Sequence, residues 1–300
     1  MAAHIVEPHP NRGSILESSP LLIFSSLVAI SIALWWSALA SLFALALRDE
    51  QYTHILLILP ISAGFIFLEW KAPASRSGLS AAAGSVLLLA ALLARLFVKG
   101  LSSTDVQLSL TILALVAWWV GAFILCFGLR SFWRALFPLC FLLWMVPLPQ
   151  SILNPILAWL QQGSAASAHV FFAAAGIPVE QRGTLVHIPG LTLEVAPECS
   201  SIRSSTMLLV TTMALAQLML VSLWRKAVVF AVAIPLSVVK NGLRIFLLGV
   251  LATKVDSSYL TGRLHRQGGI IYFLIALLGI FLLLWILRRC ENQQSTPMIS

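Results

Sequence analysis

The side chains best suited to catalytic chemistry in this 300-residue chain are one cysteine, one arginine and one histidine, each beside a long apolar run. Cys199 lies in "EVAPECSSIRSS" (194–205), Arg244 in "VVKNGLRIF" (238–246) and His265 in "TGRLHRQGG" (261–269). A thiolate is a strong nucleophile, a histidine transfers protons near neutral pH, and an arginine stays cationic and stabilises anions. Together these three residue types suit covalent catalysis by a cysteine.

Cys199 lies where the sequence predicts the start of a helix. Proline is favoured at the first position of a helix, so Pro197 places Cys199 in the first turn. The unpaired N–H groups and the positive end of the helix dipole there favour a thiolate, and the same N–H groups could donate to an oxyanion. Arg203, four residues further on, lies on the same face of that helix.

The elements that must position these residues are membrane helices. The chain is 59% hydrophobic and only 10% charged, whereas about a quarter of a globular chain is charged. Solid apolar runs of bilayer-spanning length favour helices over a β-barrel, whose strands alternate. The formal net charge of +8 is spread over short loops, so no basic stripe indicates nucleic acid as a partner.

The apolar runs predict an all-α polytopic membrane protein with about eight transmembrane helices. They lie at about 21–47, 54–69, 79–98, 106–127, 133–148, 206–224, 227–251 and 269–287. "SALAS" at 37–41 resembles a signal-peptidase site, but the apolar run continues to Leu47, so we expect the first helix to be retained. We expect a cytoplasmic tail at 1–20, one transmembrane domain at 21–289 and a cytoplasmic tail at 290–300.

A longer segment at about 150–198 separates the fifth and sixth predicted helices, and we expect it outside the cytoplasm. Its first half is amphipathic and predicts a helix that lies along or dips into the membrane. Its second half, "IPVEQRGTLVHIPGLTLEV" at 177–195, alternates apolar and polar residues around two glycines and predicts a small β-hairpin.

The distribution of basic residues places both termini in the cytoplasm by the positive-inside rule. Helical rise then gives depth: Lys226 to Arg244 spans about 27 Å, Cys199 to Arg225 about 39 Å, and His265 to Arg288 about 35 Å. The hydrocarbon core is about 30 Å thick. Cys199 and His265 therefore fall at the outer interface, and Arg244 can extend its side chain towards them.

The three motifs, in this order and spacing, closely resemble those of the exosortase/archaeosortase family. The resemblance extends over about residues 20–290 and includes "DEQYTHILLILPI" (49–61), "FPLCFLLWMVPLPQSI" (137–152) and "GIPVEQRGTLVHIPGLTLEV" (176–195). One departure is Ser201, which stands where the family often has glycine and could narrow the space beside Cys199.

The resemblance implies a membrane-embedded cysteine protease or transpeptidase that cleaves C-terminal sorting signals of exported proteins. Such a signal has a short Pro-Glu-Pro-type motif, a transmembrane helix and a basic tail (PEP-CTERM). By resemblance, Cys199 is the nucleophile that forms the thioester, Arg244 the essential arginine and His265 the third member. Histidine at that position indicates a bacterial member, in the inner membrane with an extracytoplasmic active site. The residues offer no metal-ligand spacing, and we expect no cofactor.

Five further residues are candidates for substrate binding or support. Arg203 is a second cation, and Glu198 could orient the arginines or lie in a solvated loop. Asn241 could fix its helix by hydrogen bonding, one turn from Arg244. Tyr52 and His54 could line the substrate entrance or anchor the chain at the membrane interface.

Two other classes of protein stay open at this point. A transporter would suit eight helices with polar residues in the seventh, although its site would be expected near the midplane and often between related halves. A non-catalytic membrane scaffold would make Cys199 dispensable. Cys126, Cys140 and Cys290 are expected to be packing residues.

Overall fold

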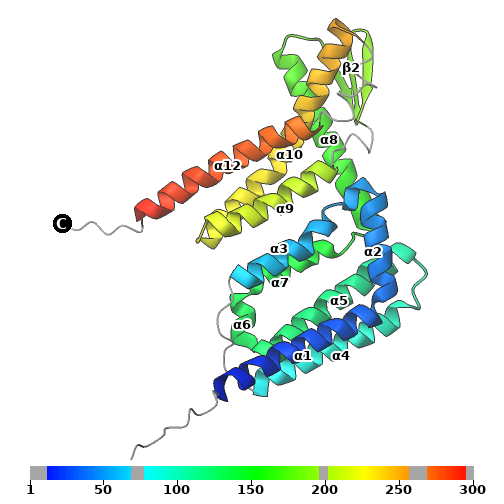
Figure 1. Cartoon of the computed structure of the whole chain (residues 1–300). Helices are drawn as coiled ribbons and strands as arrows, with labels where there is room; N and C mark the ends of the chain where they lie inside the picture. Colours follow the sequence, from blue (N-terminus) through cyan, green and yellow to red (C-terminus); the bar gives the residue numbers. More distant parts are fainter. Residues whose placement is uncertain (1–11, 69–77, 196–201, 257–268, 295–300) are drawn as a thin grey trace, which may run out of the picture. The chain divides into compact units, whose positions relative to one another are not determined.

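The computed structural model describes residues 12–68, 78–195, 202–256 and 269–294. These residues form helices and one small sheet (Figure 1). Chain contacts divide the molecule into two compact units. The first unit comprises Met1–Arg48 and Ile55–Pro149, and the second comprises Asp49–His54 and Gln150–Ser300.

The first unit is built around a close helix pair. Its elements are α1 (Arg12–Leu34), α2 (Trp36–Arg48), α3 (Ile55–Leu68), α4 (Gly78–Val98), α5 (Thr104–Phe127), α6 (Leu129–Arg134), α7 (Leu136–Phe141) and η2 (Leu142–Met145). A Cβ on Gly84 of α4 would lie 2.7 Å from the backbone nitrogen of Leu125 on α5. Only glycine lets these two helices approach so closely.

The first predicted helix is bent rather than straight. Helices α1 and α2 meet at 75° around Trp35. The Trp35 side chain is buried, and its Nε1 donates a hydrogen bond to the carbonyl of Thr111 on α5 at 3.1 Å. The apolar run alone does not encode this bend, because both halves are equally apolar.

The second unit holds the residues singled out by the sequence. Its elements are η1 (Glu50–Tyr52), α8 (Gln150–Ala174), β1 (Glu180–Arg182), β2 (Leu185–Ile188), β3 (Leu191–Glu194), α9 (Ile202–Met219), α10 (Leu223–Lys254) and α12 (Gly269–Gln294). The strands form an antiparallel sheet in the order β1-β2-β3. Gly183 and Gly190, with φ of 62° and 82°, lie between them in the left-handed region that glycine adopts freely. The prediction of a single hairpin is therefore wrong. The segment forms two consecutive hairpins, because a turn lies at each glycine.

The amphipathic pattern of 150–174 reflects packing against another helix. The amide of Asn241 on α10 donates to Ser164 on α8 at 2.9 Å, and both side chains are buried. A Cβ on Gly242 would lie 2.4 Å from the Cβ of Ser167 on α8. The polar side of α8 at Ser164 and Ser167 is therefore turned towards α10.

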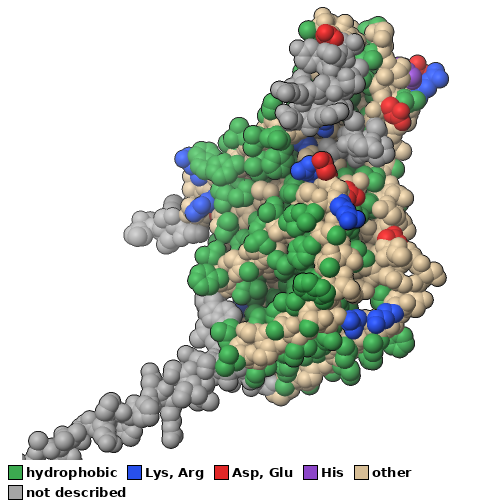
Figure 2. All heavy atoms as spheres, turned by 45° about the vertical axis from the view of Figure 1, so that its right-hand side comes forward, with side chains coloured by type: hydrophobic (Ala, Val, Ile, Leu, Met, Phe, Trp, Pro, Cys, Tyr) green, Lys and Arg blue, Asp and Glu red, His purple; other side chains and the backbone are tan. Residues whose placement is uncertain are grey.

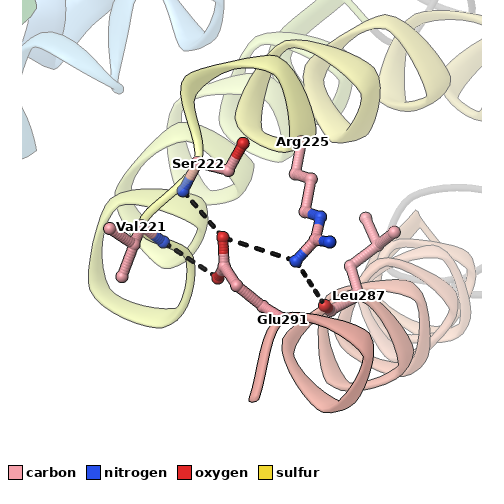
Figure 3. A network of polar contacts seen from close by, with 5 residues as sticks. All are labelled: Val221, Ser222, Arg225, Leu287 and Glu291. Carbon is pink, nitrogen blue, oxygen red and sulfur yellow. Dashed lines mark hydrogen bonds and ion pairs between the residues drawn. The ribbon is translucent and has the colours of Figure 1, made fainter. Parts of the chain in front are cut away.

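Helices α9, α10 and α12 share a hydrophobic core and a polar contact at one end. Buried Leu208, Val229 and Ile280 belong to that core. At the start of α10, the Glu291 carboxylate of α12 accepts hydrogen bonds from the N–H groups of Val221 (3.0 Å) and Ser222 (2.8 Å). The carboxylate also lies 3.5 Å from Arg225, and Figure 3 shows this network. A side chain of α12 thus caps the first turn of α10.

The described helices are those of a multi-pass membrane protein. Five of them are long and apolar enough to cross a membrane, or up to seven if each of two consecutive helix pairs forms one span. Figure 2 shows hydrophobic side chains over much of the visible surface, with Lys and Arg at scattered positions. The count of eight is not confirmed, and α9 is not among the five.

Candidate active site

Helix α10 carries polar residues in an otherwise apolar sequence. It contains Lys and Arg but no Asp or Glu. Lys240 and Asn241 are only 6% and 2% exposed, and Arg244 is partly buried. Ionisable groups inside a membrane helix are costly and mark functional positions. Because Lys240 and Arg244 are four residues apart, their side chains lie on one face of the helix.

The polar stretch of α10 is held from both sides by neighbouring helices. The Lys240 ammonium donates to the hydroxyl of Ser204 on α9 at 2.5 Å. On the other side, the Asn241 amide donates to Ser164 on α8 at 2.9 Å. These contacts fix the rotation of α10 about its axis and so the direction in which Arg244 leaves the helix.

Arg244 extends to the first turn of α12. Its Nη1 lies 3.9 Å from the position that a Cβ on Gly269 would occupy. Gly269 is the first described residue after 257–268. A Cβ at Gly269 would be in ordinary van der Waals contact with the guanidinium. Arg244 thereby lies beside the start of α12.

Arg203 forms an ion pair that the sequence did not predict. Its Nη1 lies 2.8 Å from Oε2 of Glu50 in η1, and the side chains are 50% and 79% exposed. Exposed pairs of this kind are worth about 0–1 kcal/mol, so Arg203 can exchange its partner at little cost. An acid in the "DEQYTH" segment was the available signal, but its proximity to residue 203 depends on tertiary structure.

Tyr52 and His54 lie in the same short segment and are buried. Their exposed fractions are 7% and 9%. His54 Nδ1 lies 3.2 Å from the carbonyl of Gln51, and the Asp49 carboxylate accepts the Gln51 N–H at 2.9 Å. In this structure the His54 side chain contacts the turn that carries Glu50, and both side chains present little surface to a substrate.

The comparisons with known proteins found a matching family. A family model described as transmembrane exosortase matches residues 35–282. The chain belongs to the transmembrane exosortase family. No curated protein and no solved structure matches it. The family is one of membrane peptidases and transpeptidases that process exported proteins bearing C-terminal signals. The match covers most of the exosortase chain, including Arg203, Arg244 and the segment of Tyr52 and His54.

Three of the predicted site residues of this exosortase lie outside the described residues. Cys199 and Glu198 fall in 196–201, and His265 falls in 257–268. The described site therefore brings together Asn241 and Arg244 on α10, and separately Arg203 with Glu50. The sequence indicated Lys240 as an ionisable residue in an apolar span, but it gave no sign of Gln161 and Ser204 as contacts, because their roles depend on which helices are neighbours.

The remaining cysteines and acids add no second centre to the described part of this exosortase. Cys126 is buried as expected, whereas Cys140 and Cys290 are exposed, which contradicts their prediction as packing residues. Among the described residues, no group of three or more His, Cys, Asp or Glu side chains could hold a metal ion.

Proposed function

We propose that this exosortase cleaves C-terminal sorting signals of exported proteins through an acyl-enzyme thioester on Cys199, with Arg244 and His265 as partners. The observation that carries the proposal is a set of three contacts on one short stretch of α10. Each is made by a described residue that is close in the chain to Cys199 or His265. Val195 shares a hydrophobic cluster with Ile245, Ser204 bonds Lys240, and Gly269 borders Arg244. Lys240 to Ile245 covers only about 8 Å of helix axis.

Chain length supports the participation of the two segments that carry Cys199 and His265. An extended chain spans at most about 3.5 Å per residue. Cys199 is three residues before Ile202 and four after Val195, so its Cα is within about 11 Å and 14 Å of theirs. His265, four residues before Gly269, is within about 14 Å of it. This reach allows both side chains to approach Arg244, as the proposal requires.

Cys199, Arg244 and His265 can together carry out a complete reaction cycle. His265 takes the proton of the Cys199 thiol, and the thiolate attacks the carbonyl carbon of the scissile peptide bond. Arg244, which stays protonated, stabilises the oxyanion. Collapse breaks the C–N bond, and the proton on His265 passes to the departing amine. An acceptor amine or water then attacks the thioester and gives its proton to His265, the C–S bond breaks, and His265 returns the proton to the sulfur of Cys199.

The remaining roles follow from the same proposal. The substrate carries a PEP-CTERM-type signal of motif, transmembrane helix and basic tail, and the enzyme lies in the bacterial inner membrane with its site on the extracytoplasmic side. Asn241 positions α10, and Arg203 offers a second cation to the substrate. Tyr52, His54 and Glu198 support the substrate-facing loops. The proposed catalytic domain is continuous over 21–289.

Trapping of the acyl-enzyme tests the proposal. The full-length chain is co-expressed with an exported protein that carries the tripartite C-terminus, and peptides of the enzyme are identified by mass spectrometry. We expect the substrate attached to Cys199 through its new C-terminal carbonyl, with Cys140→Ala unaffected. Full processing by Cys199→Ala would exclude the cysteine mechanism, and a chain that binds but never cleaves would favour a transporter or scaffold.

A further inference from the structure

The end of β3 is held by a side chain from another helix. The amide of Gln161 on α8 donates to the carbonyl of Val195 at 2.9 Å. The N–H of Val195 donates in turn to the carbonyl of Thr184 at 3.0 Å. Val195 is 1% exposed and lies in the cluster formed by α8, the sheet and Ile245. Both backbone groups of Val195, four residues before Cys199, are therefore satisfied by fixed partners.

The start of α9 is held in a comparable way from α10. Lys240 donates to the hydroxyl of Ser204 at 2.5 Å, five residues after Cys199. Lys240 is 6% exposed, so its ammonium has little access to water, and the hydroxyl partly replaces that water. None of the ion pairs found among the described residues includes Lys240. Ser204 is thus an important hydrogen-bond partner for a cation inside the helix bundle.

We propose that Gln161 and Lys240 are positioning residues for Cys199. They fix the two described ends of the segment that carries the thiol, Gln161 through the carbonyl of Val195 and Lys240 through the hydroxyl of Ser204. The inference rests on the proposed function, since it assigns the two contacts to the placement of the nucleophile.

Gln161 and Lys240 act together because their helices, α8 and α10, are packed closely against each other. Gly242 of α10 lies so close to α8 that a Cβ there would be 2.9 Å from the backbone nitrogen of Ala168. The Asn241–Ser164 bond lies beside that contact. Gln161 is one turn of α8 from Ser164, and Lys240 adjoins Asn241. A fixed pair of helices therefore presents two donors to described residues on either side of Cys199 in the chain.

Positioning has a kinetic consequence that differs from substrate binding. Misplacement of a nucleophile by about 1 Å can cost about 100-fold in rate. The loss appears in kcat and in the intrinsic accessibility of the thiol, and KM changes little because both donors already bond groups of the chain itself.

The chain offers matched controls for both donors. Lys226, on the same helix as Lys240, donates to the neutral oxygen of Gln217 on α9 at 2.7 Å. Gln181 donates to the carbonyl of Gly183 at 3.0 Å in the exposed turn after β1. Lys226→Met and Gln181→Glu remove the same types of bond at places remote from the segment of Cys199 in the chain.

The experiment uses the full chain with Cys126→Ala, Cys140→Ser and Cys290→Ser, so that Cys199 is the reactive thiol. Gln161→Glu, Lys240→Met, Lys240→Arg and Ser204→Ala are introduced into this background, together with the two controls. For each, the second-order rate of alkylation by a maleimide-polyethylene glycol reagent is measured in detergent. Processing of a substrate with the tripartite C-terminus gives kcat and KM in parallel.

We expect Gln161→Glu and Lys240→Met each to lower kcat by about 10- to 100-fold with KM within about threefold. Alkylation of Cys199 should change by about fivefold or more, and Lys240→Arg should recover part of the loss because it keeps a donor. Ser204→Ala combined with Lys240→Met should be no worse than Lys240→Met alone, since the two residues act through one contact. Both controls should stay within twofold of the parent.

If Lys240→Met has the same alkylation rate and kcat as its control Lys226→Met, the role of Lys240 is overturned. If Gln161→Glu has the same alkylation rate and kcat as its control Gln181→Glu, the role of Gln161 is overturned. A large rise in KM alone would assign the residues to substrate binding instead. If Lys240→Met does not fold, Ser204→Ala tests the same contact without burying a new group. The alkylation rate depends on the thiol and not on turnover, so it also distinguishes failure of the positioning role from failure of the proposed protease activity.

Discussion

Nη1 of Arg244 lies 3.9 Å from the position that a Cβ on Gly269 would occupy, which is an ordinary van der Waals separation. Gly242, two residues before Arg244, has no such room. A Cβ there would lie 2.4 Å from the Cβ and the Oγ of Ser167. Both glycines adjoin the proposed catalytic arginine, but only Gly242 is required by the packing of α8 against α10.

Gly242→Ala should therefore be destabilising, while Gly269→Ala should be tolerated. A side chain at 242 must push α8 away, and overpacking of this kind costs about 1–3 kcal/mol. Gly64→Ala on α3, where nothing lies within 4 Å, is a control for the general effect of alanine in a helix. The free energy of unfolding in detergent and the processed fraction of substrate are measured for all three. A Gly242→Ala protein as stable as Gly64→Ala would contradict the close approach of α8 and α10.

Glu291→Gln should weaken the junction of α10 and α12. The carboxylate accepts two backbone N–H groups and lies 3.5 Å from Arg225, whose side chain is 8% exposed. The amide offers one acceptor oxygen in place of two and leaves the buried guanidinium without its carboxylate, at a cost of about 1–3 kcal/mol. Glu180→Gln is the control, because its pair with Arg182 is 61% and 72% exposed and worth little. Unfolding curves that coincide for the two variants would show that the junction adds no stability.

Much of this structure could be predicted from the residue types and from the lengths of the apolar runs. The helix pattern and the strands around Gly183 and Gly190 follow from periodicity and turn residues. The bend at Trp35 does not, because it depends on a hydrogen bond to Thr111, 76 residues away. Likewise, the sequence indicated Arg244 and Asn241 as polar residues in an apolar helix, but their neighbours were set by tertiary packing.

The amphipathic stretch at 150–174 shows why a pattern can be read in two ways. Polar residues at helical spacing fit either a helix at a membrane surface or a helix whose polar side meets another polar side. Ser164 bonds Asn241 and Gln161 bonds the carbonyl of Val195, so the polar side is used inside the second unit. Periodicity identifies the polar face of a helix but not the element that packs against it.

The proposed orientation predicts the labelling of cysteines in intact cells. A membrane-impermeant thiol reagent should modify Cys199 and spare Cys290, because Cys199 is proposed to face outwards and Cys290 inwards. Cys290 is exposed and Cys126 is buried in the structure, so protection of Cys290 reports the side of the membrane and not burial. Permeabilised cells provide the control, in which Cys290 should react. Modification of Cys290 in intact cells would reverse the orientation.

Activity should survive chelation and be lost on alkylation. The described residues contain no cluster of three potential metal ligands, and the proposed nucleophile is a thiol. Purified enzyme is treated with EDTA or with N-ethylmaleimide, and the ratio of full-length to processed substrate is followed on a gel. Protection of activity by prior binding of substrate would link the alkylation to the active site. Inhibition by EDTA that added zinc reverses would contradict a metal-free mechanism.

The division of roles among the charged residues is tested by substitutions that keep or remove the guanidinium. Arg244→Lys should lower processing about as severely as Arg244→Ala, by roughly 100-fold or more, because a point charge does not replace the planar fork that holds an oxyanion. Arg203→Lys should be mild, since an ammonium can still pair with the exposed Glu50 carboxylate. Cys199→Ala should abolish processing in a folded protein. His265→Ala should reduce it by about 10²- to 10⁴-fold, the usual worth of general acid–base catalysis.

Glu50→Gln completes this comparison, because it removes the partner of Arg203 and leaves α10 untouched. It should resemble Arg203→Lys and leave Arg244→Lys equally defective in the double variant. The processed fraction is measured for every variant at matched expression. If Arg244→Lys behaves as wild type while Arg203→Lys fails, the cation that stabilises the oxyanion is Arg203, and the Glu50–Arg203 pair then belongs to the active site itself.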